Sequence, residues 1–546
     1  MTRSRRSVLA SISLIVMGLV SAVAVATTPG DLDPTFGDGG KVLLPGPGGA
    51  IGAEILSDGQ IIVGGGEFEA VRLKPNGVVD QFFGTLGRAK FQQPPGWAEA
   101  MVIQPDGKIV MAGWEYPERV MLVRFGSNGL PDWSFGNKGR VAVDLAPGEE
   151  RFLTLALQAD GKIVAGGWAS GAYGLLALAR FMPDGQLDAG FGDGGVVRSQ
   201  PDTPGHSAFD LAIQPDGRIV IVGWMANCCD IDLAVSRYLG DGTIDQSFGT
   251  GGTSRLELSE MRPPGTPPNS YELPFAVALQ NDGKIVVGGD VEWSSLEFGD
   301  LLLARFTDAG TLDPTFDGDG ILVKSFPGPG EPTARDLAIQ SDGRILVAGG
   351  FGFFFGDGEY QFQVLRFEPD GSLDESFGDG GRVVSAFGTR GAARSLAIAP
   401  DGRILAAGLS IDSTDSWAVA RYLVGAPPPC TITGTNGDDN LIGTPGVDVI
   451  CAGPGNDTIE GRDGNDVVYG GPGDDVILGG RGDDTLEGGP GRDSLIGGEG
   501  SDRLFGGADE DTLDGIDGTA GNDMLTGGGG TDSCAADPGD QVSSCP

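Results

Sequence analysis

The chain has 546 residues, too many for one ordinary core, and its length predicts about two to four domains. Its 97 Gly and 35 Pro indicate many short elements joined by turns rather than long helices. The formal charge of -40 excludes nucleic acid as a partner, because a phosphate-binding surface must be basic, and it argues equally against anionic membranes.

The N-terminus has the pattern of an export signal. Arg3, Arg5 and Arg6 precede an apolar run that ends in the small residues Ala24–Ala26. This pattern predicts a signal peptide at residues 1–26, cleaved after Ala26, and a protein that is secreted or held at the cell surface. The alternative is an uncleaved anchor, because the run from Val8 could nearly span a bilayer. After cleavage we expect no transmembrane segment.

Six cysteines are compatible with export into an oxidising space. Cys430 and Cys451 bracket the start of an acidic C-terminal region, and Cys534 and Cys545 bracket its end. We therefore expect two disulfides that staple this region. The adjacent pair Cys228–Cys229 forms either a vicinal disulfide or two thiols.

Between the signal and residue 425, three phrases recur seven times in fixed order. They are LDPTFG from Leu32, DGKIVMAGW from Asp106, and an apolar run that ends in Arg. The phrase aspartates in register are Asp33, Asp80, Asp132, Asp188, Asp245, Asp313 and Asp374; the arginines are Arg72, Arg124, Arg180, Arg237, Arg305, Arg366 and Arg421. Each repeat holds four short strand-like runs, and its Asp-Gly pairs suit tight hairpin turns.

Seven repeats of four antiparallel strands are best satisfied by a closed ring of packed sheets. We therefore predict an all-β fold in which residues 27–425 form a seven-bladed β-propeller. The phrases resemble the delta-60 repeat family of β-propellers, and that resemblance implies a fold without any catalytic residue. Seven equivalent Asp and Arg residues are expected to be turn clamps and ion pairs rather than catalytic groups.

The phase of the repeats predicts how the ring closes. The chain enters at an LDPTFG phrase and leaves after Tyr422, so Leu32–Phe36 should pair with Trp417–Leu423. The tight turns then lie on one face and the variable loops on the other, where a glycan or protein partner is expected. The alternative is that the loop aromatics cover their own blades. These aromatics are Tyr173, Trp293, Phe298, Phe353, Phe354, Phe355 and Tyr360.

After a linker at 426–433, aspartates recur every nine residues, each followed two positions later by a single aliphatic residue. A flexible acidic spacer would not need this phase. Six glycine-rich residues form a turn and three form a short strand, so two repeats make one coil and residue i stacks over i+18. The aspartates are Asp439, Asp448, Asp457, Asp466, Asp475, Asp484, Asp493, Asp502 and Asp511, then, after a three-residue insertion, Asp523 and Asp532.

Carboxylates stacked about 5 Å apart repel by roughly 3 kcal/mol at an effective dielectric of about 20, so a cation is required. Oxygen ligands without Cys or His in register select a hard cation, calcium before magnesium. The stretch resembles hemolysin-type (RTX) calcium-binding repeats, although GTPGVDVIC and GGADEDTLD depart from their glycine pattern. The resemblance implies a calcium-binding parallel β-roll at 434–535, with each aspartate above as a calcium ligand. Neighbouring Asp474 and Asp483 are expected to face solvent.

These features together predict an exported, non-enzymatic protein, with a disulfide-stapled tail at 536–546 and a roll that folds on calcium outside the cell. The only histidine is His206, and no nucleophile elbow or P-loop is present. An extracellular hydrolase or lyase is the alternative, and it predicts acidic residues from different blades meeting at the propeller axis. A purely structural cell-envelope spacer is a third possibility.

Overall fold

A computed structural model describes residues 29–543 and 545, apart from 34–35, 57, 92–95, 117–118, 146–147, 170–174, 199–206, 227–230, 259–270, 293–299, 327–332, 351–360, 389, 400, 412–414, 425–429, 436 and 520–522. The predicted signal peptide, Cys228–Cys229 and the seven loop aromatics lie outside the described residues. Within this part of the chain every regular element is a strand. It contains no helix with the length and apolar character needed to cross a membrane.

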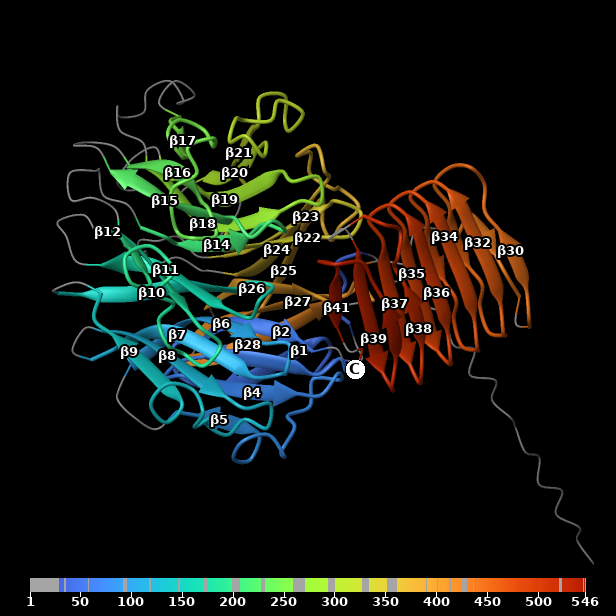
Figure 1. Ribbon diagram of the computed structural model, residues 1–546, viewed down its shortest axis with the longest axis horizontal. Coiled ribbons are helices and arrows are strands. Elements are labelled where there is room, and N and C mark those ends of the chain that lie inside the picture. Colours follow the sequence, from blue (N-terminus) through green and yellow to red (C-terminus); the bar gives the residue numbers. More distant parts are fainter. Residues whose placement is uncertain are drawn as a thin grey trace, which may run out of the picture.

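The N-terminal domain consists of seven four-stranded units (Figure 1). Units 1 to 4 are β2 (Ala50–Ile55), β3 (Ile61–Gly65), β4 (Glu69–Leu73), β5 (Arg88–Lys90); β6 (Gly96–Ile103), β7 (Ile109–Glu115), β8 (Arg119–Phe125), β9 (Arg140–Val143); β10 (Glu150–Leu157), β11 (Ile163–Ala169), β12 (Leu175–Phe181), β13 (Val196–Arg198); and β14 (Asp210–Ile213), β15 (Ile219–Ala226), β16 (Ile231–Tyr238), β17 (Thr253–Leu256). Units 5 to 7 are β18 (Tyr271–Leu279), β19 (Ile285–Glu292), β20 (Asp300–Phe306), β21 (Ile321–Lys324); β22 (Asp336–Ile339), β23 (Ile345–Gly349), β24 (Phe362–Phe367), β25 (Arg382–Ser385); and β26 (Arg390–Ile398), β27 (Ile404–Ile411), β28 (Asp415–Tyr422) with β1 (Lys41–Pro45).

The first strands of the units form a closed ring, because each contacts the first strand of the next unit and β26 contacts β2. Within units the strands pair antiparallel, and a single parallel bridge between Ile231 and Tyr271 joins units 4 and 5 into one sheet. The prediction of an all-β propeller followed by a parallel solenoid is confirmed.

Both ends of the propeller chain meet in unit 7. Leu32 bridges Tyr422, and the amide of Gly30 donates to the carbonyl of Leu423 over 2.7 Å. The continuous ladder, however, joins β1 to β28, several residues beyond the predicted segment. The described copies of the LDPTFG phrase form turns rather than strands; for example, the amide of Phe83 donates back to the carbonyl of Asp80 over 3.1 Å.

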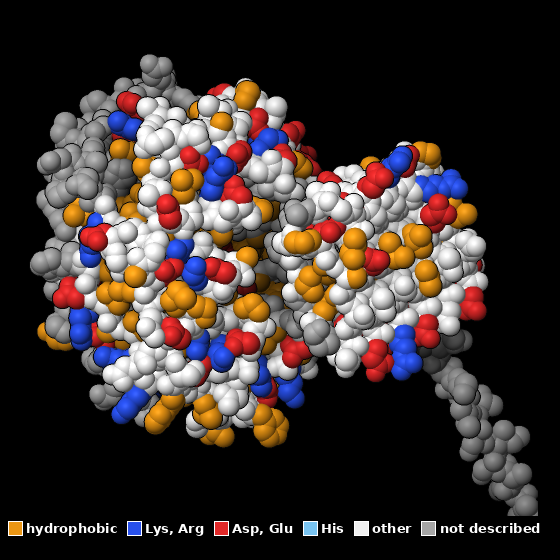
Figure 2. Space-filling view, in the orientation of Figure 1, with side chains coloured by type: hydrophobic (Ala, Val, Ile, Leu, Met, Phe, Trp, Pro, Cys, Tyr) orange, Lys and Arg blue, Asp and Glu red, His pale blue; other side chains and the backbone are white. Residues whose placement is uncertain are grey.

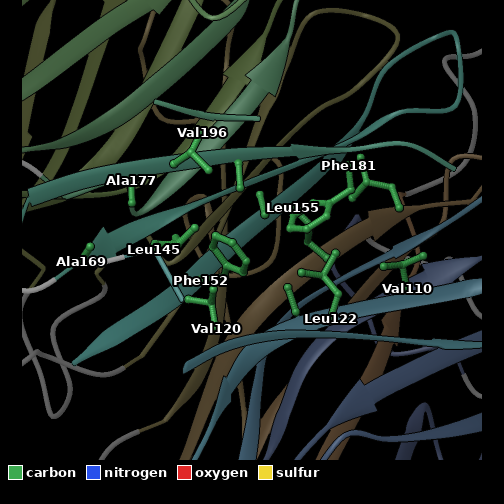
Figure 3. Packing of buried hydrophobic residues seen from close by; sticks show 14 of the residues in the cluster. Val110, Val120, Leu122, Leu145, Phe152, Leu155, Ala169, Ala177, Phe181 and Val196 are labelled. Atoms are coloured by element: carbon green, nitrogen blue, oxygen red, sulfur yellow. The ribbon is translucent and has the colours of Figure 1, made fainter. Parts of the chain in front are cut away.

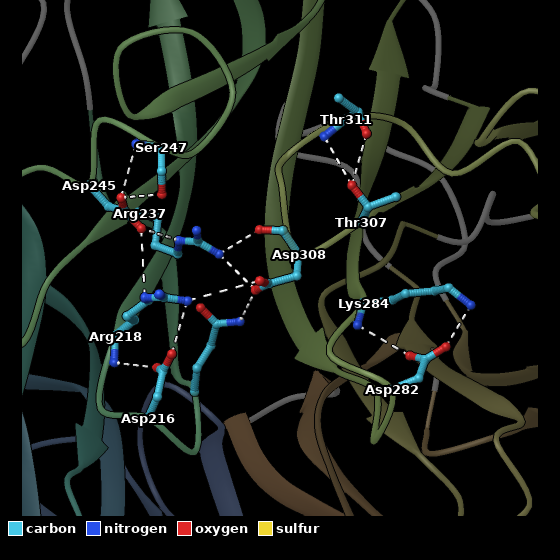
Figure 4. Close-up of polar contacts among 11 residues, drawn as sticks. Asp216, Arg218, Arg237, Asp245, Ser247, Asp282, Lys284, Thr307, Asp308 and Thr311 are labelled. Carbon is cyan, nitrogen blue, oxygen red and sulfur yellow. Dashed lines mark hydrogen bonds and ion pairs between the residues drawn. The ribbon is translucent and has the colours of Figure 1, made fainter.

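The seven phrase aspartates and arginines form one repeated clamp, which confirms their structural role. In each unit Arg Nε donates to an Asp Oδ2 over 2.7 to 2.9 Å. The guanidinium also lies 4.5 to 4.9 Å from the ring of the fully buried phrase Phe. Arg237 then reaches the carbonyl of Asp308 in the next unit over 2.5 Å (Figure 4). The clamp therefore fixes a turn and connects neighbouring units.

The hydrophobic core lies between facing units (Figure 3). Val110 and Leu122 of unit 2 pack with Phe152 and Phe181 of unit 3, and all four side chains are fully buried. The two phenylalanine rings meet edge to face with centroids 6.2 Å apart, a preferred aromatic geometry. Each unit therefore buries its faces only against its neighbours, as the repeat pattern requires.

The C-terminal domain is a parallel roll of two sheets. One sheet contains β29 (Ile432–Thr433), β31 (Val449–Cys451), β33 (Val467–Tyr469), β35 (Thr485–Pro490), β37 (Arg503–Ala508), β39 (Met524–Gly529) and β41 (Gln541–Ser543). The other contains β30 (Asn440–Ile442), β32 (Thr458–Asp463), β34 (Val476–Arg481), β36 (Ser494–Glu499), β38 (Thr512–Asp514) and β40 (Ser533–Ala535). Ile459 pairs with Ile477 and Leu486 with Leu504, which is the predicted spacing of eighteen. Both expected disulfides, Cys430–Cys451 and Cys534–Cys545, are formed.

The roll packs beside one end of the propeller (Figures 1 and 2). Arg503 Nη2 in β37 donates to Asn281 Oδ1 over 3.0 Å, and Asn281 lies in the tight turn between β18 and β19. The roll therefore contacts the tight-turn face. The second strand of each unit begins at this face and ends at the opposite end of the propeller.

Candidate calcium-binding site

The eleven aspartates of the nine-residue repeats are called the ladder aspartates below, and nine of them are fixed by their Oδ1 atom. Oδ1 of Asp484 accepts the amide of Asp466 over 2.8 Å, and Oδ1 of Asp502 accepts the amide of Asp484 over 2.9 Å. The same bond, between residues one coil apart, recurs along the roll. It holds each carboxylate in the turn and leaves its second oxygen for another partner.

That second oxygen, Oδ2, is buried and has no hydrogen-bond partner within the described part of the chain in nine aspartates: Asp457, Asp466, Asp475, Asp484, Asp493, Asp502, Asp511, Asp523 and Asp532. Such oxygens normally have a partner when they are buried. In six of these repeats the first glycine leaves space beside the oxygen, whereas Ala452 occupies that position in the repeat of Asp457. A Cβ on Gly479 would lie 2.4 Å from Oδ2 of Asp484 and 2.6 Å from the carbonyl oxygen of Gly497. A carboxylate oxygen and a carbonyl oxygen of the next coil thus line one small cradle.

The electrostatics of these cradles favour a bound cation. Burial first, and then repulsion from neighbouring ladder carboxylates, raises the pKa of Asp484, Asp493 and Asp502 to about 7. Hydrogen bonds from the backbone oppose this rise without cancelling it. A hard cation would remove both costs, since it replaces lost water and neutralises the stacked charge.

The first two ladder aspartates differ from the other nine. Oδ2 of Asp448 accepts the amide of Thr444 over 2.6 Å and its hydroxyl over 2.9 Å. Oδ2 of Asp439 accepts the same two groups of Thr435 at the same distances. The amide bond from Thr444 is the main reason that the pKa of Asp448 lies below its ordinary value. A threonine in place of the second glycine therefore supplies the partner that the other nine lack.

The donor set fits calcium through mixed ligands. Among the described residues, no three His, Cys, Asp or Glu side chains gather closely enough to hold a metal ion alone. Each cradle must therefore combine Asp Oδ2 with backbone carbonyls, which suits the six to eight oxygen ligands of calcium. Asp474 and Asp483 are exposed, as expected.

A second acidic group lies on the first strands of the propeller, where the hydrolase or lyase alternative predicts one. Glu54, Asp210 and Asp336 come from units 1, 4 and 6, and burial raises their pKa values to about 7, 6 and 8. Repulsion from Asp210 and Glu54 contributes to the rise at Asp336. The recurring DLAIQ phrase at Asp210 and Asp336 is the sequence signal that would have identified two of them.

Two of these acids already have structural partners. Asp336 Oδ2 accepts the amide of Leu396 in unit 7 over 2.6 Å, and Asp210 Oδ2 accepts the amide of Val277 in unit 5 over 2.9 Å. Asp210 Oδ1 also accepts the hydroxyl of Thr154 in unit 3 over 2.9 Å. These side chains therefore bridge the first strands of neighbouring units.

Fold and site together define a β-propeller protein joined to a parallel roll of oxygen-lined, nine-residue turns. The family RTX calcium-binding nonapeptide repeat matches in four copies, at residues 431–459, 452–486, 487–515 and 516–540. The family Domain of unknown function (DUF5122) beta-propeller matches residues 104–135, 158–191, 214–248, 280–316 and 340–377. The chain is thus a β-propeller protein that carries RTX calcium-binding repeats.

A comparison with curated proteins finds no match. Solved structures are similar only distantly. A protein of unknown function from Dyadobacter fermentans DSM 18053 is 13% identical, with a TM-score of 0.37, over 60% of this chain and 94% of its own. The polysaccharide lyase Uly1 is 11% identical, with a TM-score of 0.40, over 69% of this chain and 90% of its own. YCF48 bound to D1 peptide is 11% identical, with a TM-score of 0.39, over 73% and 99%. Similarities this weak carry no argument about activity.

Proposed function

We propose that this is an exported, non-enzymatic protein whose roll folds when calcium binds and whose propeller holds a glycan or protein partner on the variable-loop face. The observation that carries the proposal is the set of nine Oδ2 atoms that are buried without a partner among the described residues, six of them beside a glycine-lined cradle. Bound calcium supplies the positive charge that these oxygens lack. Its binding free energy then becomes folding free energy for the roll.

Export is supported by the N-terminal pattern and by the two disulfides of the roll, which suit an oxidising space outside the cytoplasm. Extracellular calcium would allow the roll to fold only after export. Without a bound cation, the aspartate carboxylates of the roll would repel one another at neutral pH.

Hydrogen–deuterium exchange of the full-length chain tests this proposal. In chelator, peptides from residues 457–535 should exchange fast while peptides from residues 100–400 stay protected. Millimolar calcium should protect the roll, and magnesium at the same concentration should not, because magnesium requires a smaller octahedral site. A roll that is equally protected in chelator would overturn the proposal.

The hydrolase or lyase alternative has one favourable observation, the raised pKa of Glu54, whose charge also raises the pKa of Asp336. This alternative predicts that the unaltered chain cleaves a polysaccharide. It also predicts that Glu54→Gln abolishes the cleavage. We favour the non-enzymatic function because Asp210 and Asp336 are committed to backbone amides.

A further inference from the structure

The variable-loop end of the propeller holds a pocket of about 290 Å³ between units 1, 2, 3 and 7. Trp97, Trp114, Arg151, Arg394 and Glu99 contribute the side chains considered below. All five lie on strands; Arg394 is at the middle of β26, and the other four are in the strand halves farthest from the Asp-Gly turns. The pocket is therefore carried by the rigid sheets and lies at the opposite end from the roll.

Two indoles form an aromatic wall of this pocket. Trp97 and Trp114 are directly opposite each other on β6 and β7, and Trp97 is 36% exposed. Glycine at position 48 makes room for the first indole, because a Cβ there would lie 2.4 Å from Cζ3 of Trp97. One indole is thus set against backbone while part of its surface remains open to a ligand.

A cation lies next to this wall. The Arg151 guanidinium lies 4.9 Å from the ring centroid of Trp114 and 5.8 Å from that of Trp168. Among the described residues it makes neither a hydrogen bond nor an ion pair, although its five N–H groups can donate in a fixed fork. Aromatic contacts hold the guanidinium in place and leave its donors for an anion.

Further polar groups complete the pocket. Trp114 Nε1 donates to Glu99 Oε1 over 3.3 Å, and Arg394 Nη1 donates to the carbonyl of Gly48 over 3.0 Å. Two guanidinium groups thus accompany one carboxyl in a chain whose formal charge is -40. Such a local reversal of charge favours an anionic ligand with a flat apolar side.

We propose that this pocket binds a uronic-acid residue of an acidic glycan, an inference that rests on the proposed binding role of the propeller. A pyranose ring presents an apolar C–H face that can lie on the Trp97 indole. Its carboxylate pairs with Arg151, and its hydroxyls reach Glu99. An acidic peptide offers the carboxylate but no flat ring beside it, so the aromatic wall distinguishes the two ligands.

Further tryptophans suit a polymer of such residues. Trp114, Trp168 and Trp224 occupy the same position of the second strand in units 2, 3 and 4, where the sequence reads AGW, GGW and VGW. Consecutive blades therefore present indoles along an arc that begins at the pocket. A chain of sugar rings could contact them in succession.

Isothermal titration of the full-length protein with oligogalacturonate tests the proposal, with a neutral oligosaccharide of equal length and polyglutamate as comparison ligands. Each titration is run in chelator and in calcium, because the pocket should bind whether or not the roll is folded. We expect oligogalacturonate binding, and about 10- to 100-fold weaker binding for Trp97→Ala and Arg151→Gln. Trp133→Ala is the matched control, since Trp133 is 72% exposed and lies on the tight-turn side. It should bind normally.

Thermal melts confirm that each variant is folded, and Arg151→Lys should recover part of the loss because it keeps the charge without the fork. No binding of oligogalacturonate, equal binding of polyglutamate, or unchanged binding by folded Trp97→Ala would overturn the assignment. Each of these results leaves the calcium-dependent protection of the roll intact, so failure of the pocket and failure of the calcium proposal are distinguishable.

Discussion

Replacement of Asp484 by Asn tests whether the ladder contains two kinds of aspartate. In one kind Oδ2 lacks a partner, and in the other Oδ2 accepts hydrogen bonds from a threonine. Oδ2 of Asp484 is buried without a partner, whereas Oδ2 of Asp448 already accepts two hydrogen bonds from Thr444. In Asp484→Asn the remaining carbonyl can still accept the amide of Asp466, and an NH₂ group replaces the unpartnered oxygen. We expect this variant to bind calcium more weakly, while Asp448→Asn binds it normally but loses stability.

The structure sets the magnitudes. A pKa of about 7 in place of 3.8 corresponds to about 4 kcal/mol against the Asp484 carboxylate at high pH, and solvent screening of the thin roll reduces this to about 2 kcal/mol. Asp484→Asn removes that cost in chelator. In calcium it loses a charged ligand, which should weaken binding about 10- to 100-fold. Asp448→Asn weakens hydrogen bonds to a charged group, about 1.5 to 3 kcal/mol, without altering a cradle.

Calcium titrations followed by exchange of roll peptides give the midpoint for each variant, and urea unfolding in saturating calcium gives the stability. The expected pattern is a raised calcium midpoint for Asp484→Asn and a lowered unfolding free energy with an unchanged midpoint for Asp448→Asn. Equal midpoint shifts in the two variants would refute the division, because then the threonine-bonded oxygens would bind calcium as well.

The propeller should also become less stable as the pH rises, because the pKa values of Asp336 and Glu54 are raised above those of the unfolded chain. The stability that these two protonated side chains contribute to the propeller is complete below about pH 4, and it is lost as the pH rises through about 7 to 8. The melting temperature should therefore fall between about pH 5 and pH 8.5, and Asp336→Asn should flatten the curve; a rise over this range would contradict the assignment. Deletion of residues 27–40 should lower the melting temperature strongly, because it removes the fully buried Phe36 and the Asp33 partner of Arg421. An unchanged melting temperature would show that ring closure does not depend on this segment.

The repeat count and phase predicted the architecture because each unit is too small to bury its own faces. The segment that closes the ring was harder to predict. The LDPTFG phrase alternates apolar and polar residues like a strand, yet the phrase aspartate binds the amide two residues on. Asp188 Oδ1 accepts the amide of Gly190 over 3.0 Å, and Asp245 Oδ1 accepts that of Ser247 over 3.0 Å. This local bond makes the phrase a turn, and the strand begins after it.

The candidate calcium site was predictable to the level of the repeat. The nine-residue phase predicted which aspartates point into the turns, and it predicted Asp474 and Asp483 as exposed neighbours. The separate behaviour of Asp439 and Asp448 depends on whether a threonine hydroxyl and amide can reach Oδ2, which only coordinates show. The pocket beside Trp97 depends in the same way on contacts between units.

The position of the roll connects the two proposals. Burial raises the pKa of Glu487 in β35, and the nearby Asp401 of a propeller turn raises it further, so like charges meet where the two domains touch. A metal-free roll, with 24 acidic residues against four Arg from Gly434 onward, would increase that repulsion. Bound cations reduce it and favour contact with the tight-turn face. The aromatic pocket lies at the far end from this contact, so the docked roll leaves it open.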